Sequence, residues 1–485
     1  MKKKNDAHNL LLINPWIFDF TAFDLWSKPL GLLYIASFIR ELGYDIQLLD
    51  CLDKHHPALA VTSAMKGRLK VKKYGTGPFP RQIVSKPEIL NFVPRHFSRY
   101  GISEEIFLEE LKKCKLPAAI LVTSFMTYWY LGPKRVVELC RDVFPETPII
   151  LGGIYASLMP EHAQKVVKPD YLITGPGEIE VSKLLSSLLE NAPAIQNSHK
   201  ILDDFPFPAL DLYQKLDYLP IMTSRGCPYR CTFCATDKIS GGYAQRDPEL
   251  VFQELYENVK RFNIKDIAFY DDALLLNKNQ RLLPILEKVI EKKMKVRFHT
   301  PNGLHARQID KKVAQLFRLS GFTTIRLSFE TVNPERFADM KYKIAPDDLI
   351  RAVETLERAG YSRNLIETYI LMGLPHQTFL EVFESILFAH SLGIKIRLAS
   401  FSPIPGTVDF NRAVKDGLYP ENADPLLTNK TIFPLHRNIE SYRKFSEIRQ
   451  FVNILNQAVD RKVNLFKSTE LRQGFSDFLQ SAENK

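Results

Sequence analysis

The sequence has few cysteines, no long apolar run and no signal-peptide core. Six cysteines among 485 residues are too sparse for a disulfide scaffold. No uninterrupted apolar stretch approaches the roughly 20 residues that a membrane-spanning helix needs. The basic start, residues 1–4, runs directly into polar Asn5 and Asp6. These absences exclude secreted disulfide-rich and membrane-spanning classes, and we expect a cytoplasmic protein.

Composition and charge bound the remaining classes. Apolar residues make up 45% and charged residues 25%, which excludes a disordered or fibrous chain, and the length predicts two or three domains. Of the net charge of +10, residues 65–115 contribute twelve Lys and Arg against five Asp and Glu. We interpret this segment as a solvated basic insertion. The alternative is a contact surface for nucleic acid, a membrane surface or an acidic substrate.

Short apolar runs alternate with amphipathic stretches over residues 1–200. This pattern predicts an α/β domain with a doubly wound parallel sheet, Rossmann or flavodoxin-like. The expected strands are 10–14, 46–50, 119–124, 148–153 and 171–175. A basic insertion at about 54–115 interrupts the alternation and ends in an expected helix at 104–113.

The carboxyl ends of these strands should meet at one edge of the sheet, where such sheets bind ligands. The residues expected there are Asn14, Ser124, Gly152, Gly153 and Gly175. Glycine lets a bulky cofactor approach the backbone closely, so the domain is predicted to hold one. Turn geometry alone is an equally good explanation of the glycines.

A Pro-rich linker at residues 203–208 precedes a second series of strand–helix units over residues 209–410. Its expected strands are 219–224, 267–270, 296–300, 324–330, 366–372 and 396–401. Six units predict an open, partial (β/α) barrel with its active site at the carboxyl ends of the strands. Residues 411–485 are expected to form a small, mostly helical extension with a helix near 441–463.

Three of the cysteines, Cys227, Cys231 and Cys234, follow the first expected barrel strand in a C-x-x-x-C-x-x-C loop. Three soft ligands can hold three corners of a [4Fe–4S] cluster and leave the fourth iron open. A structural zinc site would need a fourth Cys or His, which does not follow at the usual spacing. A redox dithiol would leave Cys227 unexplained. The other cysteines, Cys51, Cys114 and Cys140, are expected to be ordinary buried thiols.

This loop resembles that of the radical S-adenosylmethionine (SAM) superfamily, whose members share C-x-x-x-C-x-aromatic-C after the first barrel strand. The resemblance implies that Cys227, Cys231 and Cys234 bind the cluster and that Phe233 contacts the adenine of SAM. In that family the open iron chelates the amino and carboxylate groups of SAM. An electron from the reduced cluster then breaks the sulfonium bond and gives a 5′-deoxyadenosyl radical.

Later strand ends resemble further SAM-binding segments of the superfamily. Asp271 and Asp272 stand where the family usually has a Gly-Gly-Glu-like segment that binds the SAM amine, so either is a candidate and either can instead cap a helix. The resemblance also implies SAM contacts for Asn302, Ser328 and Glu330. The turns at 372–375 and 402–407 resemble adenine-side turns. His299 and His305 are candidate acid–base groups, with a structural role as the alternative.

The N-terminal layout resembles that of the radical SAM class with a cobalamin-binding domain. The matching stretches are residues 29–32, 149–157 and 174–178, which include Tyr155 and Glu178, and in that class they surround the corrin. The D-x-H-x-x-G motif is absent between Asn14 and Gly31, which implies cobalamin bound without a protein histidine ligand. The aromatic run 128–130 would pack under the corrin or belong to the core.

The resemblance implies a radical SAM enzyme that transfers a methyl group from cobalamin to an unactivated carbon. Radical cyclisation, oxidation or rearrangement, with or without cobalamin, is the alternative, and a non-enzymatic iron–sulfur redox or nucleic-acid-binding sensor is a distant one. The implied partners are a small-molecule substrate and a reductant such as flavodoxin or ferredoxin. The sequence does not identify the substrate or the oligomeric state.

Overall fold

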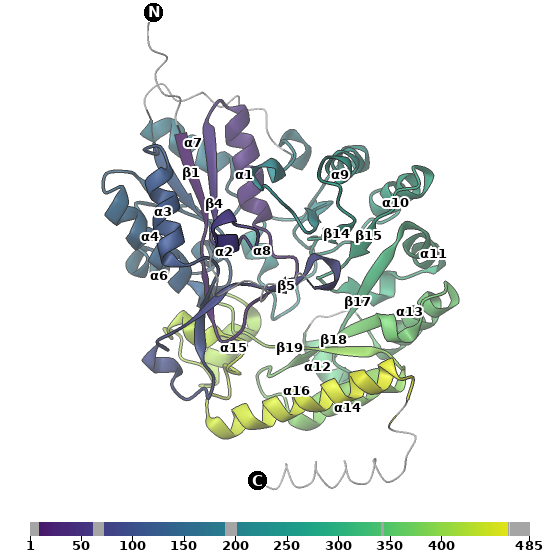
Figure 1. The fold of residues 1–485 in the computed structure, drawn as a ribbon. Coiled ribbons are helices and arrows are strands. Elements are labelled where there is room, and N and C mark those ends of the chain that lie inside the picture. The colour runs from purple at the N-terminus through teal and green to yellow at the C-terminus, as the bar shows by residue number, and fades with distance from the viewer. Residues whose placement is uncertain (1–8, 62–71, 190–200, 341–343, 464, 466–485) are drawn as a thin grey trace, which may run out of the picture.

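The computed structural model describes residues 9–61, 72–189, 201–340, 344–463 and 465. Two parallel sheets with flanking helices stand side by side, one built from the N-terminal third of the chain and the other from its middle (Figure 1). Residues 62–71 of the predicted basic insertion lie outside the described residues, as do residue 464 and residues 466–485 of the predicted extension. Within the described part, no helix is both long and apolar enough to cross a membrane.

The N-terminal sheet has five parallel strands in the order β10-β9-β8-β1-β4. Their bounds are β1 Asn9–Asn14, β4 Asp45–Asp50, β8 Ala119–Val122, β9 Ile149–Leu151 and β10 Tyr171–Leu172. Every residue of β1, β8 and β9 is buried, because helices cover both faces. This strand order is the flavodoxin-like one, so the predicted doubly wound fold is confirmed.

Helices on the two faces of this sheet pack into separate apolar clusters. One face carries α1 (Leu30–Glu41) and α7 (Glu178–Leu188), and the other carries α3 (Glu104–Lys113) and α4 (Leu131–Val143). The short helices of this domain are α2 Pro57–Val61, α5 Ile154–Leu158 and α6 Pro160–Val166. Helix α3 has the predicted bounds, since Ser103 caps its start and Lys112 and Lys113 occupy its last turn.

The second sheet is an open barrel whose strands follow the chain in the order β11-β14-β15-β17-β18-β19. Their bounds are β11 Leu219–Ile221, β14 Asp266–Phe269, β15 Arg297–His299, β17 Phe322–Glu330, β18 Ile366–Met372 and β19 Lys395–Ser400. All neighbours are parallel, and β11 and β19 are the two ends of the pairing order. The six predicted units and the open barrel are therefore confirmed.

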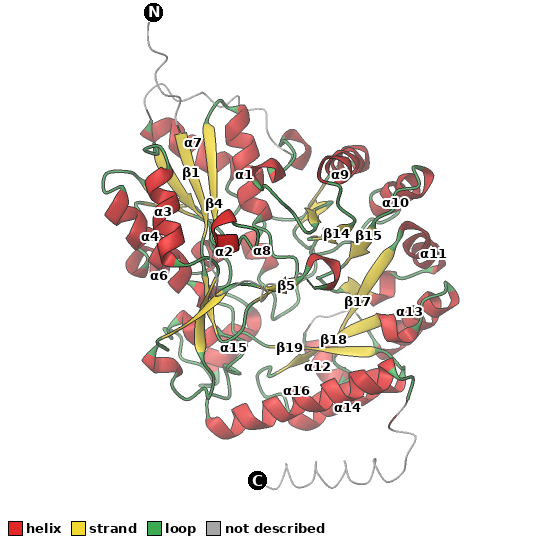
Figure 2. Ribbon diagram, viewed as in Figure 1, coloured by secondary structure: helices red, strands yellow, loops and turns green. Residues whose placement is uncertain are grey.

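Helices cover the outside of this barrel (Figure 2). They are α9 Pro248–Phe262, α10 Leu282–Glu291, α11 Lys311–Ser320, α13 Pro346–Arg358 and α14 Phe379–Ser391. Helix α16 (Ile439–Asp460) lies against β19 and α14 (Figure 1) and starts and ends slightly earlier than the predicted helix. Smaller elements complete the barrel region: α8 Thr236–Ile239, α12 Pro334–Asp339, α15 Val408–Lys415, the pair β12 Ser224–Arg225 and β13 Ala244–Gln245, and β16 Leu304–His305.

The insertion is more ordered than the sequence suggested, because it pairs with the segment that follows β1. Strand β7 (Phe97–Tyr100) pairs with both β2 (Ile17–Asp19) and β6 (Arg81–Val84), and β3 (Phe23–Asp24) pairs with β5 (Gly77–Pro78). These strands are too short to give a periodic signal in the sequence. Trp26, just after β3, and Tyr74, just before β5, pack against His299 of the barrel, with ring centroids 4.7 Å away in each case.

Candidate functional site

The cysteine loop lies between β12 and α8, at the carboxyl end of the first barrel strand. Cys227, Cys231 and Cys234 all line one cavity of about 360 Å³, which we call the cluster cavity. Gly226 allows the chain to enter the loop, because its φ is +78° and an added Cβ would lie 2.1 Å from the carbonyl oxygen of Gly242. The structure thus brings the three predicted ligands to one cavity.

A network of hydrogen bonds holds the middle of the cysteine loop in place. Thr232, which is 2% exposed, donates its hydroxyl to Oδ2 of Asp409 at 2.8 Å, and its carbonyl accepts the backbone N–H of Asp409 at 3.0 Å. Arg412 donates to Oδ1 of the same carboxylate at 3.1 Å. The start of α15 therefore anchors the cysteine loop. Sequence reasoning missed Thr232 and Asp409, since Thr232 occupies a variable position of the cysteine motif and Asp409 lies outside it.

None of the three cysteines forms a disulfide, and burial raises the pKa of the Cys227 thiol to about 11 and that of the Cys231 thiol to about 12. No group of three or more Cys, His, Asp or Glu within the described residues is gathered around a single metal-ion position. A cubane cluster does not need such a point, because each thiolate binds a different iron. The donor set of three soft ligands beside an open cavity therefore fits a cluster.

The other SAM candidates separate into those that face the cluster cavity and one that does not. Phe233, Asp272, Asn302, Ser328 and Glu330 line the cavity. Burial is the main cause that raises the pKa of Asp272 to about 6 and that of Glu330 to about 8. Carboxylates desolvated in this way are suited to pair with an ammonium group.

Asp271 has a structural position instead. It is 2% exposed, and its carboxylate accepts hydrogen bonds from the backbone and hydroxyl of Thr223, the hydroxyl of Ser224 and Nη1 of Arg281. These hydrogen bonds engage the Asp271 carboxylate within the core. Of the two neighbouring carboxylates, only Asp272 is directed to the cavity, so the expectation for Asp271 is not supported by its contacts.

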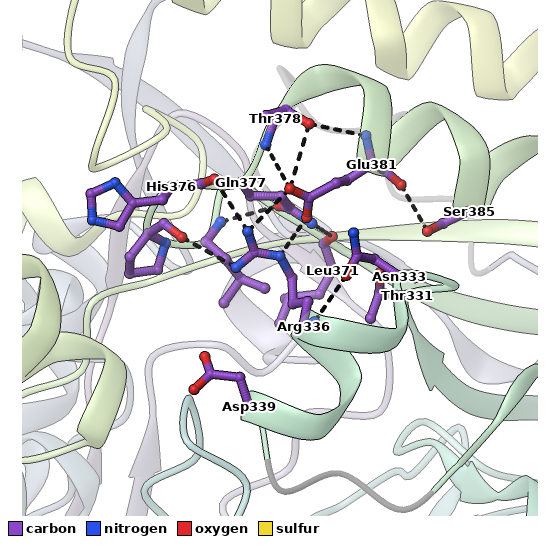
Figure 3. A network of polar contacts seen from close by, with 12 residues as sticks. Thr331, Asn333, Arg336, Asp339, Leu371, His376, Gln377, Thr378, Glu381 and Ser385 are labelled. Carbon is purple, nitrogen blue, oxygen red and sulfur yellow. Dashed lines mark hydrogen bonds and ion pairs between the residues drawn. The ribbon is translucent and has the colours of Figure 1, made fainter.

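The turn after β18 is held rigidly by its neighbours (Figure 3). Arg336 of α12 donates to the carboxylate of Glu381 and to the carbonyl oxygens of Pro375 and His376, both at 3.2 Å. Oε1 of Gln377 accepts the backbone N–H groups of Gly373, at 2.7 Å, and Leu374, at 3.2 Å. The predicted adenine-side turn at 372–375 is therefore tied to α12 and α14.

The two candidate histidines have different surroundings. His299 is completely buried, stacks on Trp26, and its Nε2 lies 2.9 Å from Oδ1 of Asp266. His305 lines the cluster cavity, and its ring lies 4.9 Å from that of Tyr229. The position of His299 matches the structural alternative, whereas His305 is within reach of a ligand.

A second cavity of about 360 Å³ lies between the carboxyl edge of the N-terminal sheet and the barrel, and we call it the interdomain cavity. Its lining includes the predicted residues Ser124, Gly152, Gly153, Gly175 and Glu178. A Cβ added to Gly31 or Gly175 would meet no atom within 4 Å, so their open faces fit a bulky flat cofactor. The described lining residues contain no histidine.

Two predicted residues of this edge lie elsewhere. Asn14 is completely buried, does not line the cavity and donates to Oδ1 of Asp50 at 2.6 Å. Tyr155 is also completely buried, and its hydroxyl lies 2.7 Å from Nδ1 of His162. Tyr128 and Tyr130 are buried and absent from the lining, so the core alternative applies to them. Asn14 at the end of β1 and Tyr155 on α5 are thus directed into the core, and cofactor contact by either residue stays a prediction.

The two cavities meet. Asp272 and Thr236 line both of them, and Arg225, two residues before Cys227, lines the interdomain cavity. Arg225 donates to the carboxylate of Glu178 in the N-terminal domain, with Nη1 3.2 Å from Oε2. Sequence reasoning missed Arg225, because Arg225 and Glu178 are 47 residues apart in the chain. A ligand in one cavity would thus lie next to a ligand in the other.

Residues 221–389, which contain the cysteine loop, match the radical SAM superfamily. An uncharacterized methyltransferase of Pyrococcus horikoshii is 25% identical over 426 residues, which are 81% of this chain and 80% of the relative. The cytidylyl-2-hydroxyethylphosphonate methyltransferase of Streptomyces wedmorensis is 22% identical over 465 residues, 81% of this chain and 78% of the relative.

Two solved structures have the same fold over most of the chain. The radical S-adenosylmethionine methyltransferase TsrM of Kitasatospora setae, with cobalamin and a [4Fe-4S] cluster bound, has a TM-score of 0.61 at 15% identity and covers 85% of this chain and 75% of its own. OxsB, a cobalamin-dependent S-adenosylmethionine radical enzyme with aqua-cobalamin bound, has a TM-score of 0.61 at 15% identity and covers 98% and 76%. The chain therefore has the two-domain fold of these proteins.

Proposed function

We propose that this chain, which has the fold of cobalamin-dependent radical SAM proteins, is a radical SAM enzyme that methylates an unactivated carbon of a small molecule. The observation that carries the proposal is the meeting of the two cavities at Asp272 and Thr236. A methyl donor in one cavity and a source of radicals in the other would both reach a substrate placed between them.

In this proposal the cluster cavity holds the [4Fe–4S] cluster and SAM. Cys227, Cys231 and Cys234 ligate the cluster, and Asp272 accepts hydrogen bonds from the SAM ammonium. The other SAM contacts come from Phe233, Asn302, Ser328 and Glu330, which line the same cavity. When bound, the reduced cluster and SAM supply a 5′-deoxyadenosyl radical, and the protein contributes position and a site that excludes water.

We assign the interdomain cavity to cobalamin. Gly152 and Gly153 at the end of β9, with Gly175 beyond β10, leave space for the corrin beside the backbone. The apolar side chains Leu30, Ile35 and Ile154 line the same space, which suits a largely apolar ring. When bound there, cobalamin would supply the methyl group, and the described lining offers no histidine to bind cobalt.

The proposal includes an electron donor such as flavodoxin or ferredoxin and a location in the cytoplasm. We interpret the basic insertion, residues 65–115, as a solvated structural feature. Within its described part, Arg99 pairs with Glu104, and Nζ of Lys113 lies 2.7 Å from Oε1 of Glu110. Part of the positive charge is thus neutralised within the insertion itself.

Expression with hydroxocobalamin tests the cofactor assignment. The purified chain should then show a corrin absorption spectrum, and its absence would contradict the cobalamin site. For the reaction, SAM with a deuterated methyl group should label a product formed in cell extract under reducing conditions. An unlabelled product would favour the alternative outcomes, namely cyclisation, oxidation or rearrangement.

A further inference from the structure

Three charged residues form one layer across the open side of the barrel, at Arg326 on β17, Glu367 on β18 and Arg397 on β19. Arg326 and Glu367 are register partners in the sheet. Nε of Arg326 lies 2.8 Å from Oε2 of Glu367, and Arg397 binds the same carboxylate with Nε at 2.9 Å and Nη2 at 2.7 Å. Two guanidinium groups therefore share one carboxylate.

This acid-binding layer, as we call Arg326, Glu367 and Arg397, lies directly below the cluster cavity. Tyr369 follows Glu367 by two residues on β18, so the two side chains point to the same face of the strand. Tyr369 lines the cluster cavity and is the register partner of Arg397. Because a strand rises about 3.3 Å per residue, Glu367 lies roughly 7 Å below Tyr369 along β18.

Aromatic rings close the barrel beneath this layer. The guanidinium of Arg326 lies over Trp26, 5.5 Å from the ring centroid, and Trp26 stacks in turn on His299. Tyr74 also packs against His299, and the guanidinium of Arg297 lies 5.4 Å from the centroid of the Tyr74 ring. Asp266, the nearest carboxylate in that lower layer, is occupied by Arg297 and His299. The negative charge of Asp266 is therefore not available to neutralise Arg326 and Arg397.

The layer retains positive charge that can be reached by a ligand. The side chain of Arg397 is 50% exposed at the edge of the sheet, whereas those of Arg326 and Glu367 are 8% and 12% exposed. Among the described residues, neither terminal nitrogen of Arg326 has a hydrogen-bond acceptor. Neither nitrogen is among the buried unsatisfied donors of the described residues, so both are accessible to a ligand. The two cations share a single carboxylate, which leaves a net positive charge.

We propose that Arg326 and Arg397 bind an acidic group of the substrate, a carboxylate or a phosphate, and hold the rest of the substrate against the cluster cavity. Guanidinium groups suit both anions, because their paired N–H donors match two oxygens. The acid enters beside the half-exposed side chain of Arg397, since the aromatic rings close the lower end of the barrel. The inference rests on the proposed function, because it assigns the substrate of that reaction.

Titration of the full-length protein with inorganic phosphate and, separately, acetate tests the inference at constant ionic strength. The fluorescence of Trp26, adjacent to Arg326, reports binding, and Trp26→Phe identifies its share of the signal. We expect at least one anion to bind saturably, and the one that binds identifies the acid. Arg397→Gln should weaken binding by about tenfold or more, since a charge-assisted hydrogen bond is lost.

The variant Glu367→Gln separates an anion-binding site from a structural ion network. Removing the shared carboxylate should tighten anion binding, whereas a structural ion network predicts only lower stability and no anion binding. Arg358→Gln is the matched control, because Arg358 is exposed on α13 and pairs with Glu354. Saturable binding that is equal in wild type, Arg397→Gln and Glu367→Gln would overturn the inference, as would no binding of either anion.

The failure of this inference is distinguishable from failure of the proposed function. Formation of 5′-deoxyadenosine by the wild-type protein without anion binding would overturn only the acid-binding layer. Anion binding that follows the expected order in a protein unable to cleave SAM would overturn the proposed reaction and leave the binding site intact.

Discussion

Arg225 and Glu178 join the two domains next to both cavities. Glu178 begins α7 of the N-terminal domain and is 4% exposed, and Arg225 ends β12 just before the cysteine loop. Nη1 of Arg225 lies 3.2 Å from Oε2 of Glu178. Because both residues line the interdomain cavity, their ion pair fixes the position of one domain relative to the other where two ligands would meet.

Removing the charge of Glu178 should loosen this junction. Glu178→Gln leaves Arg225 partly buried without a counter-charge, and we expect the free energy of unfolding to fall by about 3 kcal/mol. Urea denaturation measures it. Glu180→Gln is the control, since Glu180 is exposed on the same helix and pairs with Lys183. A change below about 0.5 kcal/mol in both variants would show that the pair contributes nothing.

Two glycines of the interdomain cavity should respond in opposite ways to alanine. Gly31→Ala adds a methyl group into open space in the first turn of α1, so we expect up to about 1 kcal/mol more stability and weaker hydroxocobalamin binding. Gly153→Ala should destabilise the protein itself, because its φ is +96° and the new Cβ would lie 2.3 Å from the carbonyl oxygen of Ser124.

Thermal denaturation and the corrin absorption spectrum separate the two effects of these alanine variants. Wild-type affinity for hydroxocobalamin in Gly31→Ala would contradict the position given to the corrin. Unchanged stability of Gly153→Ala would contradict the close approach of Gly153 and Ser124.

The contact between Asp409 and Thr232, which anchors the cysteine loop, can be removed without changing a cysteine. Asp409→Ala removes the acceptor of Thr232 and should cost about 1 to 3 kcal/mol of stability. The loop would then hold its cluster less firmly, so a chelator should remove iron faster than from wild type. Asp416→Ala at the other end of α15 is the control, because that carboxylate binds the exposed His376. Equal rates of iron loss in all three proteins would exclude Asp409 as an anchor.

Stability should fall as the pH drops below about 6.5, where histidines of an unfolded chain take up protons. Burial lowers the pKa of His299, although its bond to Asp266 opposes the change, so the native ring stays neutral where the unfolded one is charged. The loss would reach at most about 1.4 kcal/mol per pH unit for this group. Urea denaturation between pH 7.5 and 5.5 measures the slope. His299→Gln should flatten it, and an unchanged slope would assign it to other groups.

The sequence predicted the regular parts of the fold because their signals are local. Buried runs such as 10–14 and 119–122 mark parallel strands, and Ser103 marks the start of α3. The small strands that join the insertion to the segment after β1 were missed, because β3 and β5, for example, have two residues each and gain stability only from pairing. The domain limits at 200 and 410 stay predictions.

The candidate site was predictable only where residue type and spacing carry the chemistry. The cysteines, Phe233 and the glycines of the interdomain cavity line the cavities as expected. Asp271, Asn14 and Tyr155 do not line either cavity, because side-chain direction depends on tertiary partners, here Arg281, Asp50 and His162. The roles of Arg225 and Asp409 could not be predicted, because their partners, Glu178 and Thr232, are distant in the sequence.

The most direct test of the account is anaerobic reconstitution followed by reduction in the presence of SAM. We expect about four irons and four sulfides per chain and formation of 5′-deoxyadenosine. Cys227→Ala, Cys231→Ala and Cys234→Ala should each abolish both, whereas Cys140→Ala, a buried thiol outside the loop, should retain them. Fewer than about three irons in the wild type, or no 5′-deoxyadenosine from the reduced protein, would contradict the assignment of the cysteine loop.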